Sequence, residues 1–159
     1  PYCVVGKDEN GGYCVVKTAL VTEALEAEGT TVKVNKSHLF AVGDFVTVGG
    51  DLKGASDKIT AIDKSNAGYD VITLEAKIGA AKVGQVLVGV KEKTTAGKAT
   101  LVTSSSELVI TLSKVDLTVA NQSCGLMVRG TISEGNMPFP IDAGLKALMP
   151  LIRFVNKKS

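Results

Sequence analysis

The sequence predicts a mainly β protein with one short helix near the C-terminus, and three observations support this. Short runs of β-branched and aliphatic residues recur about every 8–12 residues. Glycine, asparagine and aspartate separate the runs, as in small sandwiches and barrels. Near the C-terminus, the stretch that begins at Asp142 has the pattern of a short N-capped helix. We therefore expect a small β-barrel or sandwich module followed by a C-terminal β domain.

Composition limits the classes of function. The chain has 159 residues, of which 45% are hydrophobic and 21% charged, so it is long enough for one domain or two small ones. Aromatic residues make up 4% and tryptophan is absent, which argues against a sugar-stacking cleft or a platform for single-stranded nucleic acid. The formal net charge is +2, with the signs interleaved. Neither nucleic acid nor a membrane is therefore an expected partner, and no secretory signal is recognised.

The first element expected is a β-hairpin over residues 1–17. Tyr2-Cys3-Val4-Val5 and Tyr13-Cys14-Val15-Val16 repeat one pattern on either side of a polar stretch that contains Asn-Gly. A terminal hairpin with no adjacent core in the sequence is a candidate for an arm that docks on a neighbouring molecule. We expect the whole of 1–17 to act as such a hairpin or arm.

The cysteines are predicted to be free thiols. Symmetric pairing of the hairpin strands would place Cys3 nearly opposite Cys14, within the separation that a disulfide needs. However, Cys3, Cys14 and Cys124 are an odd number in a chain of adequate size, and none forms a CxxC pair. A reducing compartment with two small half-buried side chains is the favoured interpretation.

Residues 18–92 are expected to form a β-barrel-like module. Its first segment, 18–28, is ambiguous: its alanines, leucines and glutamates favour a helix, and its alternation at period two is less clean than that of a half-buried strand, so helix and strand both stay open. From residue 30 onwards the strand pattern is clearer. The strands are expected within 31–34, 39–48, 58–63, 69–74 and 84–88.

The polar stretch 91–98 is the expected boundary before a C-terminal β domain at 98–159. A proline-marked corner at 137–140 is followed by Asp142, which is expected to cap a helix that runs through Leu148 and stops before Pro150. A frayed tail is expected at 156–159. Strands are expected within 107–112, 117–119, 125–132 and 151–155.

No catalytic, metal or cofactor site is predicted. His38 is the single histidine, and its flanks have no nucleophile motif, so a structural role is favoured over a hydrolase built from Asp44, Asp70 and His38. Gly49 and Gly50 lack phosphate-loop spacing. The mildly basic C-terminus is interpreted as a solvated tail, with an acidic surface or DNA as the alternative. Its basic residues are Lys146, Arg153, Lys157 and Lys158.

Two parts of the chain resemble known phage proteins. The segments 125–132, 137–140 and 145–155, with Arg129-Gly130, Met137-Pro138-Phe139-Pro140 and the closing Leu151-Ile152-Arg153-Phe154-Val155, resemble the C-terminal end of tailed-phage head decoration and head fibre proteins. The segments 39–48, 58–63 and 69–74 are similar to strand-turn repeats in capsid-associated proteins of gut-bacterial phages.

The resemblance implies a structural virion protein with a decoration-protein-like C-terminal β domain, no catalytic residues and no cofactor. It implies a homo-oligomer, a trimer, on the outside of the major capsid protein lattice, which the protein stiffens or to which it anchors a fibre. Such a protein would assemble in the host cytoplasm and remain on the virion. The hairpin would add strands to the lattice, and its deletion before Thr18 is expected to weaken attachment while the remainder stays folded. The expected interface residues are Tyr2, Val4, Tyr13, Val15, Met137 and Phe139.

The alternative is a ligand- or carbohydrate-binding, adhesin-like β-module of a gut bacterium or its prophage. The low aromatic content counts against sugar stacking. A glycan array without hits would weaken this alternative.

Overall fold

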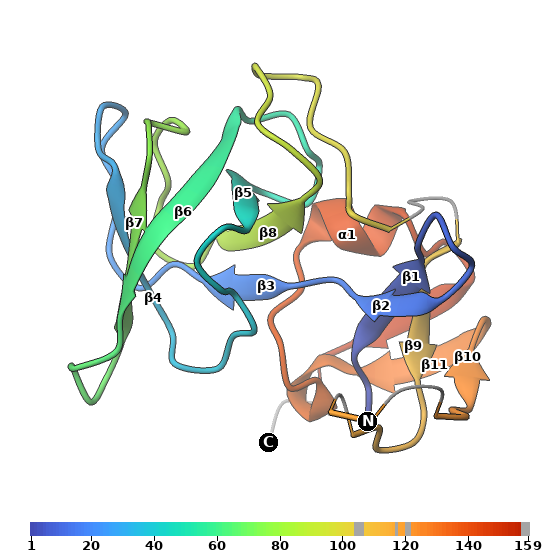
Figure 1. The fold of residues 1–159 in the computed structure, drawn as a ribbon. Helices are drawn as coiled ribbons and strands as arrows, with labels where there is room; N and C mark the ends of the chain where they lie inside the picture. The colour runs from blue at the N-terminus through green and yellow to red at the C-terminus, as the bar shows by residue number, and fades with distance from the viewer. Residues whose placement is uncertain (104–106, 117, 120–121, 157–159) are drawn as a thin grey trace.

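The computed structural model describes residues 1–103, 107–116, 118–119 and 122–156 (Figure 1). These residues form twelve strands in three sheets, the short helix α1 (Ala143–Ala147) and the 3-10 helix η2 (Glu134–Asn136). The predicted mainly β class with one short C-terminal helix is confirmed. The strands are β1 (Val4–Lys7), β2 (Tyr13–Val15), β3 (Thr18–Leu20), β4 (Thr31–Val34), β5 (Phe45–Val48), β6 (Ser56–Asp63), β7 (Asp70–Leu74), β8 (Val86–Val90), β9 (Val109–Thr111), β10 (Leu126–Met127), β11 (Gly130–Ser133) and β12 (Ile152–Val155).

Six strands form a closed barrel. Their order is β3-β8-β5-β6-β7-β4, with every neighbouring pair antiparallel. A bridge between Val21 and Val34 joins the two outer strands, and the amide of Asn35 donates to the carbonyl of Leu20 at 2.9 Å. Closure leaves this sheet without a long free edge.

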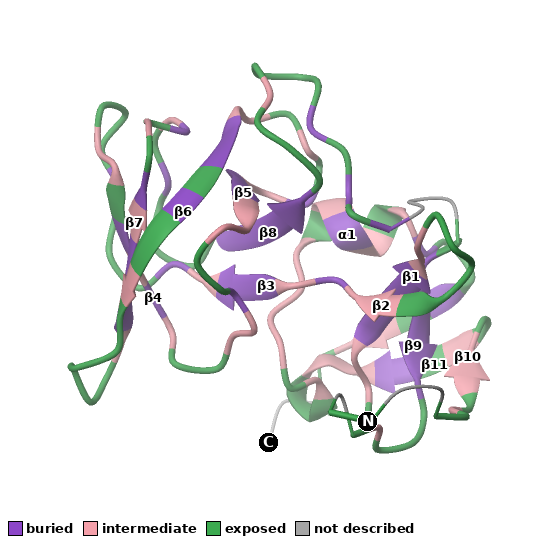
Figure 2. Ribbon diagram, viewed as in Figure 1, coloured by how far each residue is buried: buried purple, intermediate pink, exposed green. Residues whose placement is uncertain are grey.

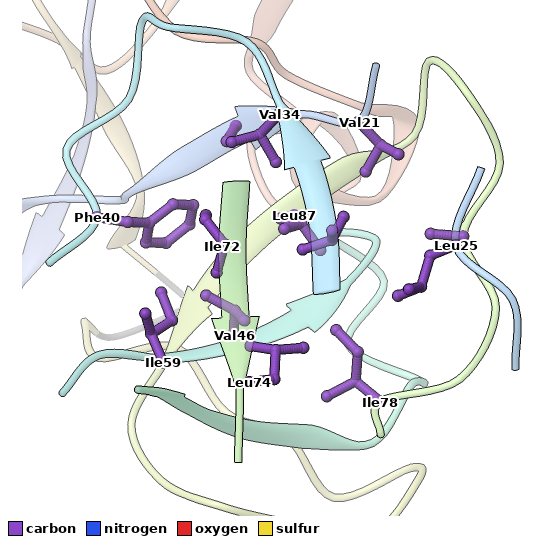
Figure 3. Close-up of a cluster of buried hydrophobic side chains, with 13 residues drawn as sticks. Val21, Leu25, Val34, Phe40, Val46, Ile59, Ile72, Leu74, Ile78 and Leu87 are labelled. Atoms are coloured by element: carbon purple, nitrogen blue, oxygen red, sulfur yellow. The ribbon is translucent and has the colours of Figure 1, made fainter. Parts of the chain in front are cut away.

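The barrel interior is filled by aliphatic side chains from all six strands and their turns. Figure 3 shows these side chains pointing toward one another, with Phe40 at one side of the cluster. Val46, Ile59, Ile72 and Leu87 have no exposed surface. In β7 buried residues alternate with partly buried ones, because successive side chains of a strand point to opposite faces of the sheet.

The barrel has a two-fold symmetric connectivity. The strands β3, β4 and β5 occupy the same relative positions as β6, β7 and β8, so rotation about an axis between β5 and β8 exchanges the two sets. In each set, a turn that contains Val-Gly comes directly before the third strand. Gly43 and Gly84 occupy these turns with φ of 99° and 86°, where a side chain would be strained.

The ambiguous segment 18–28 contains a strand and turns, with no helix. Thr18–Leu20 pairs with β8, and Leu25 forms a bridge with Ala81. Helix propensity is a weak preference, and here it is overridden because Ala19 and Val21 have no exposed surface within the barrel.

The predicted hairpin forms, but it is not a free arm. β1 pairs with β2 on one side and with β9 on the other, in a four-stranded sheet of order β10-β9-β1-β2. Val4 and Val16 are buried in a second core with Ile110 and Leu145. The first strand is therefore an inner strand of this chain's own sheet.

The register of the hairpin separates the cysteines. Cys14 lies opposite Gly6, not opposite Cys3, because the pairing is centred on Asn10 and not midway between the two Tyr-Cys-Val-Val runs. Cys3, Cys14 and Cys124 are all free thiols. The symmetric register that would have aligned Cys3 with Cys14 is wrong, and the prediction of free thiols is confirmed.

The C-terminal elements follow the predicted order. Asp142 caps α1, because its side chain accepts a hydrogen bond from the Leu145 amide at 2.9 Å. The strands β11 and β12 pair in parallel, since α1 and its flanking turns lie between them in the chain. Of the predicted strand 117–119, Leu117 lies outside the described residues, whereas Thr118 and Val119 form a turn and bend. Most of the predicted tail, 157–159, also lies outside the described residues.

One strand serves both cores. Leu87 of β8 points into the barrel, whereas Val86 and Val88 pack in the second core with Ile110 and Leu145. All five residues of β8 are buried, as its colour in Figure 2 shows. This explains why the segment is a continuous hydrophobic run, without the alternation of a strand with one exposed face.

Candidate interaction surface

The single histidine is a structural residue of the barrel. The His38 side chain has no exposed surface, and its Nε2 lies 3.0 Å from a carboxylate oxygen of Asp70. The backbone amide of Phe40 donates to His38 Nδ1 at 3.2 Å. Nδ1 is thus an acceptor, which makes Nε2 the protonated nitrogen that donates to Asp70.

Asp70 is held by two partners at once. Its side chain is 2% exposed, and its second oxygen accepts from Lys36 Nζ at 2.7 Å. Burial would raise the pKa of this carboxyl, but the hydrogen bonds and charges of Lys36 and His38 outweigh burial and lower the pKa below its usual value. Burial lowers the pKa of His38, and Asp70 only partly offsets this. Neutral His38 and ionised Asp70 thus have their hydrogen bonds satisfied by each other, by Lys36 and by the Phe40 amide. This network fixes the loop before β5.

The hydrolase alternative is not assembled. Asp44 lies apart from this network, where its carboxylate accepts from Lys17 Nζ at 2.6 Å and from the Ala41 amide at 2.8 Å. Burial raises the pKa of the Cys3 and Cys14 thiols, which keeps both protonated and poorly nucleophilic. Within the described residues, the hydrogen-bond partners of the His38 ring are the Asp70 carboxylate and the Phe40 amide, and neither is a hydroxyl or thiol.

Gly49 and Gly50 lie at the contact between the barrel and the N-terminus of α1. The carboxylate of Asp142 accepts from the Gly50 amide at 2.7 Å, in addition to capping α1. A Cβ at Gly144 would overlap the backbone of Gly50 and Asp51, so the first turn of α1 lies directly against the barrel. These glycines permit a close approach of two backbones.

The predicted interface residues are distributed over the second core and its surroundings. Val4 is 7% exposed, so it offers almost no surface to another molecule. Tyr2 packs partly buried against the second core. Tyr13 is 46% exposed, and it lines a hollow of about 510 Å³ over the four-stranded sheet together with Val15.

The other two predicted residues lie at the proline corner. Met137 and Phe139 are partly buried and line a hollow of about 450 Å³ between this corner and the barrel. The Thr18 hydroxyl donates to the carbonyl of Pro140 at 2.7 Å, which fastens the corner to β3. The proline corner therefore packs against the barrel of its own chain and also lines a surface hollow.

A groove beside the hairpin gathers exposed apolar side chains. We call it the Leu151 groove, and its volume is about 350 Å³. Three of its lining residues, Tyr13, Val128 and Leu151, are 46%, 64% and 62% exposed. Such clustering is typical of a surface that contacts another molecule, whereas single exposed apolar residues are not informative. The groove is lined by Lys7, Tyr13, Glu107, Leu108, Val109, Val128, Leu148, Met149, Pro150, Leu151 and Ile152.

Of the exposed apolar residues of this groove, the sequence analysis predicted only Tyr13 as an interface residue. Val128 and Leu151 were predicted as strand residues, but both lie just outside the strands, at the bends that precede β11 and β12. The available signal was their position beside Arg129 and Pro150, residues that usually remain at the surface. Proximity to Tyr13, more than 100 positions away, depends on tertiary structure.

Among the residues that the structure describes, no cluster of three or more histidine, cysteine, aspartate or glutamate side chains is arranged to hold a metal ion. No helix in that part of the chain has the length and apolar character needed to span a bilayer.

Comparison with family models, curated proteins and solved structures finds no match to this chain.

Proposed function

We propose that this chain is a structural, non-enzymatic protein of a tailed-phage virion. It binds the outside of the capsid as a decoration or head fibre component, where it stabilises the lattice or anchors a fibre. The sequence resemblance of 125–155 to decoration and head fibre proteins motivates the assignment. The partner is the major capsid protein lattice, and the location is the capsid surface after assembly in the host cytoplasm.

The observation that carries the proposal is the Leu151 groove. Tyr13, Val128 and Leu151 come from three separate segments, and all three expose about half or more of their surface in one place. The groove lies on a scaffold made of sheets and two packed cores, which supports a protein contact without large rearrangement. The satisfied network around His38 and Asp70 gives no competing reason to expect catalysis.

We further propose that the protein acts as a homo-oligomer, a trimer. Among the residues that the structure describes, the outer strand β2 pairs with β1 alone, and its other edge is proposed to pair with another copy. Tyr13 of β2 adds an exposed aromatic side chain at this edge. Aromatic residues are enriched in protein interfaces.

Co-sedimentation tests the capsid assignment directly. Purified chain is mixed with capsids that were assembled without it, and the bound fraction is measured after pelleting. Saturable binding at a fixed ratio to the capsid protein is the expected result. Absence of binding to capsids of the encoding phage, with the chain folded, would contradict the proposal. Light scattering coupled to size exclusion then reports whether the bound unit is a trimer.

A further inference from the structure

The only two arginines of the chain each directly follow a residue that lines the Leu151 groove. Arg129 directly follows Val128, and Arg153 lies two residues after Leu151. Both arginines are exposed, and within the described residues neither has a carboxylate at ion-pair distance. Many lysines of the barrel, in contrast, form an ion pair with a carboxylate, as Lys33 does with Glu23 at 2.6 Å.

Backbone pairing brings the two arginines to one surface. The Gly130 amide donates to the Leu151 carbonyl at 3.2 Å, which holds the bend after Val128 beside the start of β12. Arg153 is in register with Thr131 of β11. Leu151 and Arg153 are exposed while Ile152 between them is buried, as the alternation along an extended strand requires.

The rim of the groove carries an excess of positive charge. Lys7 lines it, the exposed residues Arg129 and Arg153 directly follow its lining residues Val128 and Ile152, and Glu107 is the one carboxylate that lines it within the described residues. Glu107 lies 3.8 Å from Lys7, and both side chains are about half exposed. The two arginines therefore remain available to a partner. Their planar guanidinium groups suit bidentate hydrogen bonds to carboxylates.

We propose that the Leu151 groove with Arg129 and Arg153 is the face that binds the capsid, and that its partner is a carboxylate-bearing protein segment with apolar side chains. The inference rests on the proposed function, and it adds the surface and the chemistry of the partner. The apolar side chains of that segment fill the groove beside Val128 and Leu151. Its carboxylates pair with the arginines at the rim.

The observations favour a protein over a nucleic acid as the occupant. Val128 and Leu151, which lie close to the arginines in the chain, expose more than 60% of their surface, and interfaces with nucleic acid are more polar than interfaces between proteins. The net charge of +2 gives no general attraction to a polyanion. The mixed apolar and cationic character instead resembles that of protein interfaces, in which arginine is enriched.

Charge reversal tests the surface. The double variant Arg129→Glu with Arg153→Glu is compared with Lys82→Glu with Lys98→Glu, which makes the same charge change at two exposed lysines that do not line the groove and have no ion-pair partner in the described residues. We expect the arginine variant to bind capsids about tenfold more weakly or not at all, and the lysine variant to bind as wild type does. Leu151→Ser, which retains the charges, is also expected to weaken binding. Circular dichroism confirms that each variant is folded.

The outcomes separate this inference from the proposed function. If the wild-type chain does not sediment with capsids, both are wrong. If wild type and the arginine variant sediment equally, only the assignment of the surface is wrong. Loss of the oligomer in the arginine variant, by light scattering, would make the occupant a second copy. Binding of duplex DNA by wild type that the arginine variant loses, without a change in capsid binding, would make the occupant a nucleic acid.

Discussion

At the scale of single residues, the contact between α1 and the barrel depends on two glycines. A Cβ at Gly144 would overlap the backbone nitrogen of Asp51, and a Cβ at Gly50 would overlap the Asp142 carboxylate. Backbone atoms cannot move aside as a flexible side chain does, so α1 would have to shift away from the second core. Leu145, which has no exposed surface, would shift with it.

We therefore predict that Gly144→Ala lowers the free energy of unfolding by about 1–3 kcal/mol or more. Urea unfolding measures this. The matched control is Gly135→Ala in η2, because the nearest atom to a Cβ there is a flexible side-chain oxygen at 3.8 Å. Equal stability of Gly144→Ala and wild type would show that α1 does not lie as closely on the barrel as described.

His38 gives the barrel a dependence on pH. Its pKa is lowered by burial from the ordinary 6.5, whereas in the unfolded chain the ring takes up a proton near that value. The unfolded state thus binds more protons below pH 6.5, so the stability contributed by neutral His38 is present above this pH and is lost as the pH falls. Asp70, whose pKa is lowered from 3.8, adds a second loss below that pH.

We predict that the free energy of unfolding of wild type begins to fall below about pH 6.5 and falls further below about pH 3.8. His38→Gln removes the first titration, so its stability is expected to change little between about pH 7 and pH 5. Denaturant unfolding at a series of pH values measures both. If the unfolding free energy of His38→Gln still falls below about pH 6.5, another titrating group causes that loss.

At the scale of elements, the hairpin has become part of the second core. β1 lies between β2 and β9, and removal of residues 1–17 would take away Val4 and Val16, which are 7% and 5% exposed. Burial of an aliphatic side chain of this kind contributes about 1.5–3 kcal/mol. Weak attachment of a truncated chain to capsids would thus report unfolding as well as a lost contact.

We predict that deletion of 1–17 lowers the free energy of unfolding by about 3–6 kcal/mol and removes hydrogen-exchange protection from the amides of β9. Deletion of Pro1 alone is the control, because this residue is exposed and takes no part in β1. If the truncated chain keeps wild-type stability and the protection of β9, the hairpin is a detachable arm as first expected.

The elements also show what sequence can and cannot predict. Asp142 identified the start of α1 correctly because a cap is a local signal, and residue periodicity located most of the strands, although Thr118 and Val119 of the predicted strand 117–119 form a turn and a bend. The segment 18–28 was undecided because the contacts that make it a strand come from β8, about 70 residues away. Of the exposed apolar residues of the groove, only Tyr13 was predicted to lie at an interface. Val128 and Leu151 are brought together by the pairing of β11 with β12, which local sequence does not reveal.

At the scale of the whole molecule, β8 joins two cores that the sequence assigned to separate modules. Leu87 faces the barrel interior and Val88 faces the second core, and both have no exposed surface. The contact between α1 and Gly50 and the hydrogen bond from Thr18 to Pro140 join the same two parts. Loss of packing on either side of β8 should therefore weaken the other side.

We predict a single cooperative unfolding transition for the whole chain. Leu87→Ala removes packing from the barrel at a cost of about 2–5 kcal/mol, which lowers the Tm of this one transition by about 4–20 °C. Val88→Ala, in the second core, is expected to lower the same transition by a smaller amount, because fewer buried atoms are removed. Val83→Ala is the control, since Val83 is 65% exposed and its substitution costs within about 0.5 kcal/mol.

Scanning calorimetry distinguishes one unit from two. A calorimetric enthalpy equal to the van't Hoff enthalpy indicates that the barrel and the second core unfold together. Two resolved transitions, of which Leu87→Ala moves one and Val88→Ala the other, would show that residues 18–92 and 98–159 are independent domains. In a cooperative chain the side chains of β8 transmit strain between the barrel and the second core, so a partner that occupies the Leu151 groove would also stabilise the barrel, on the far side of that strand.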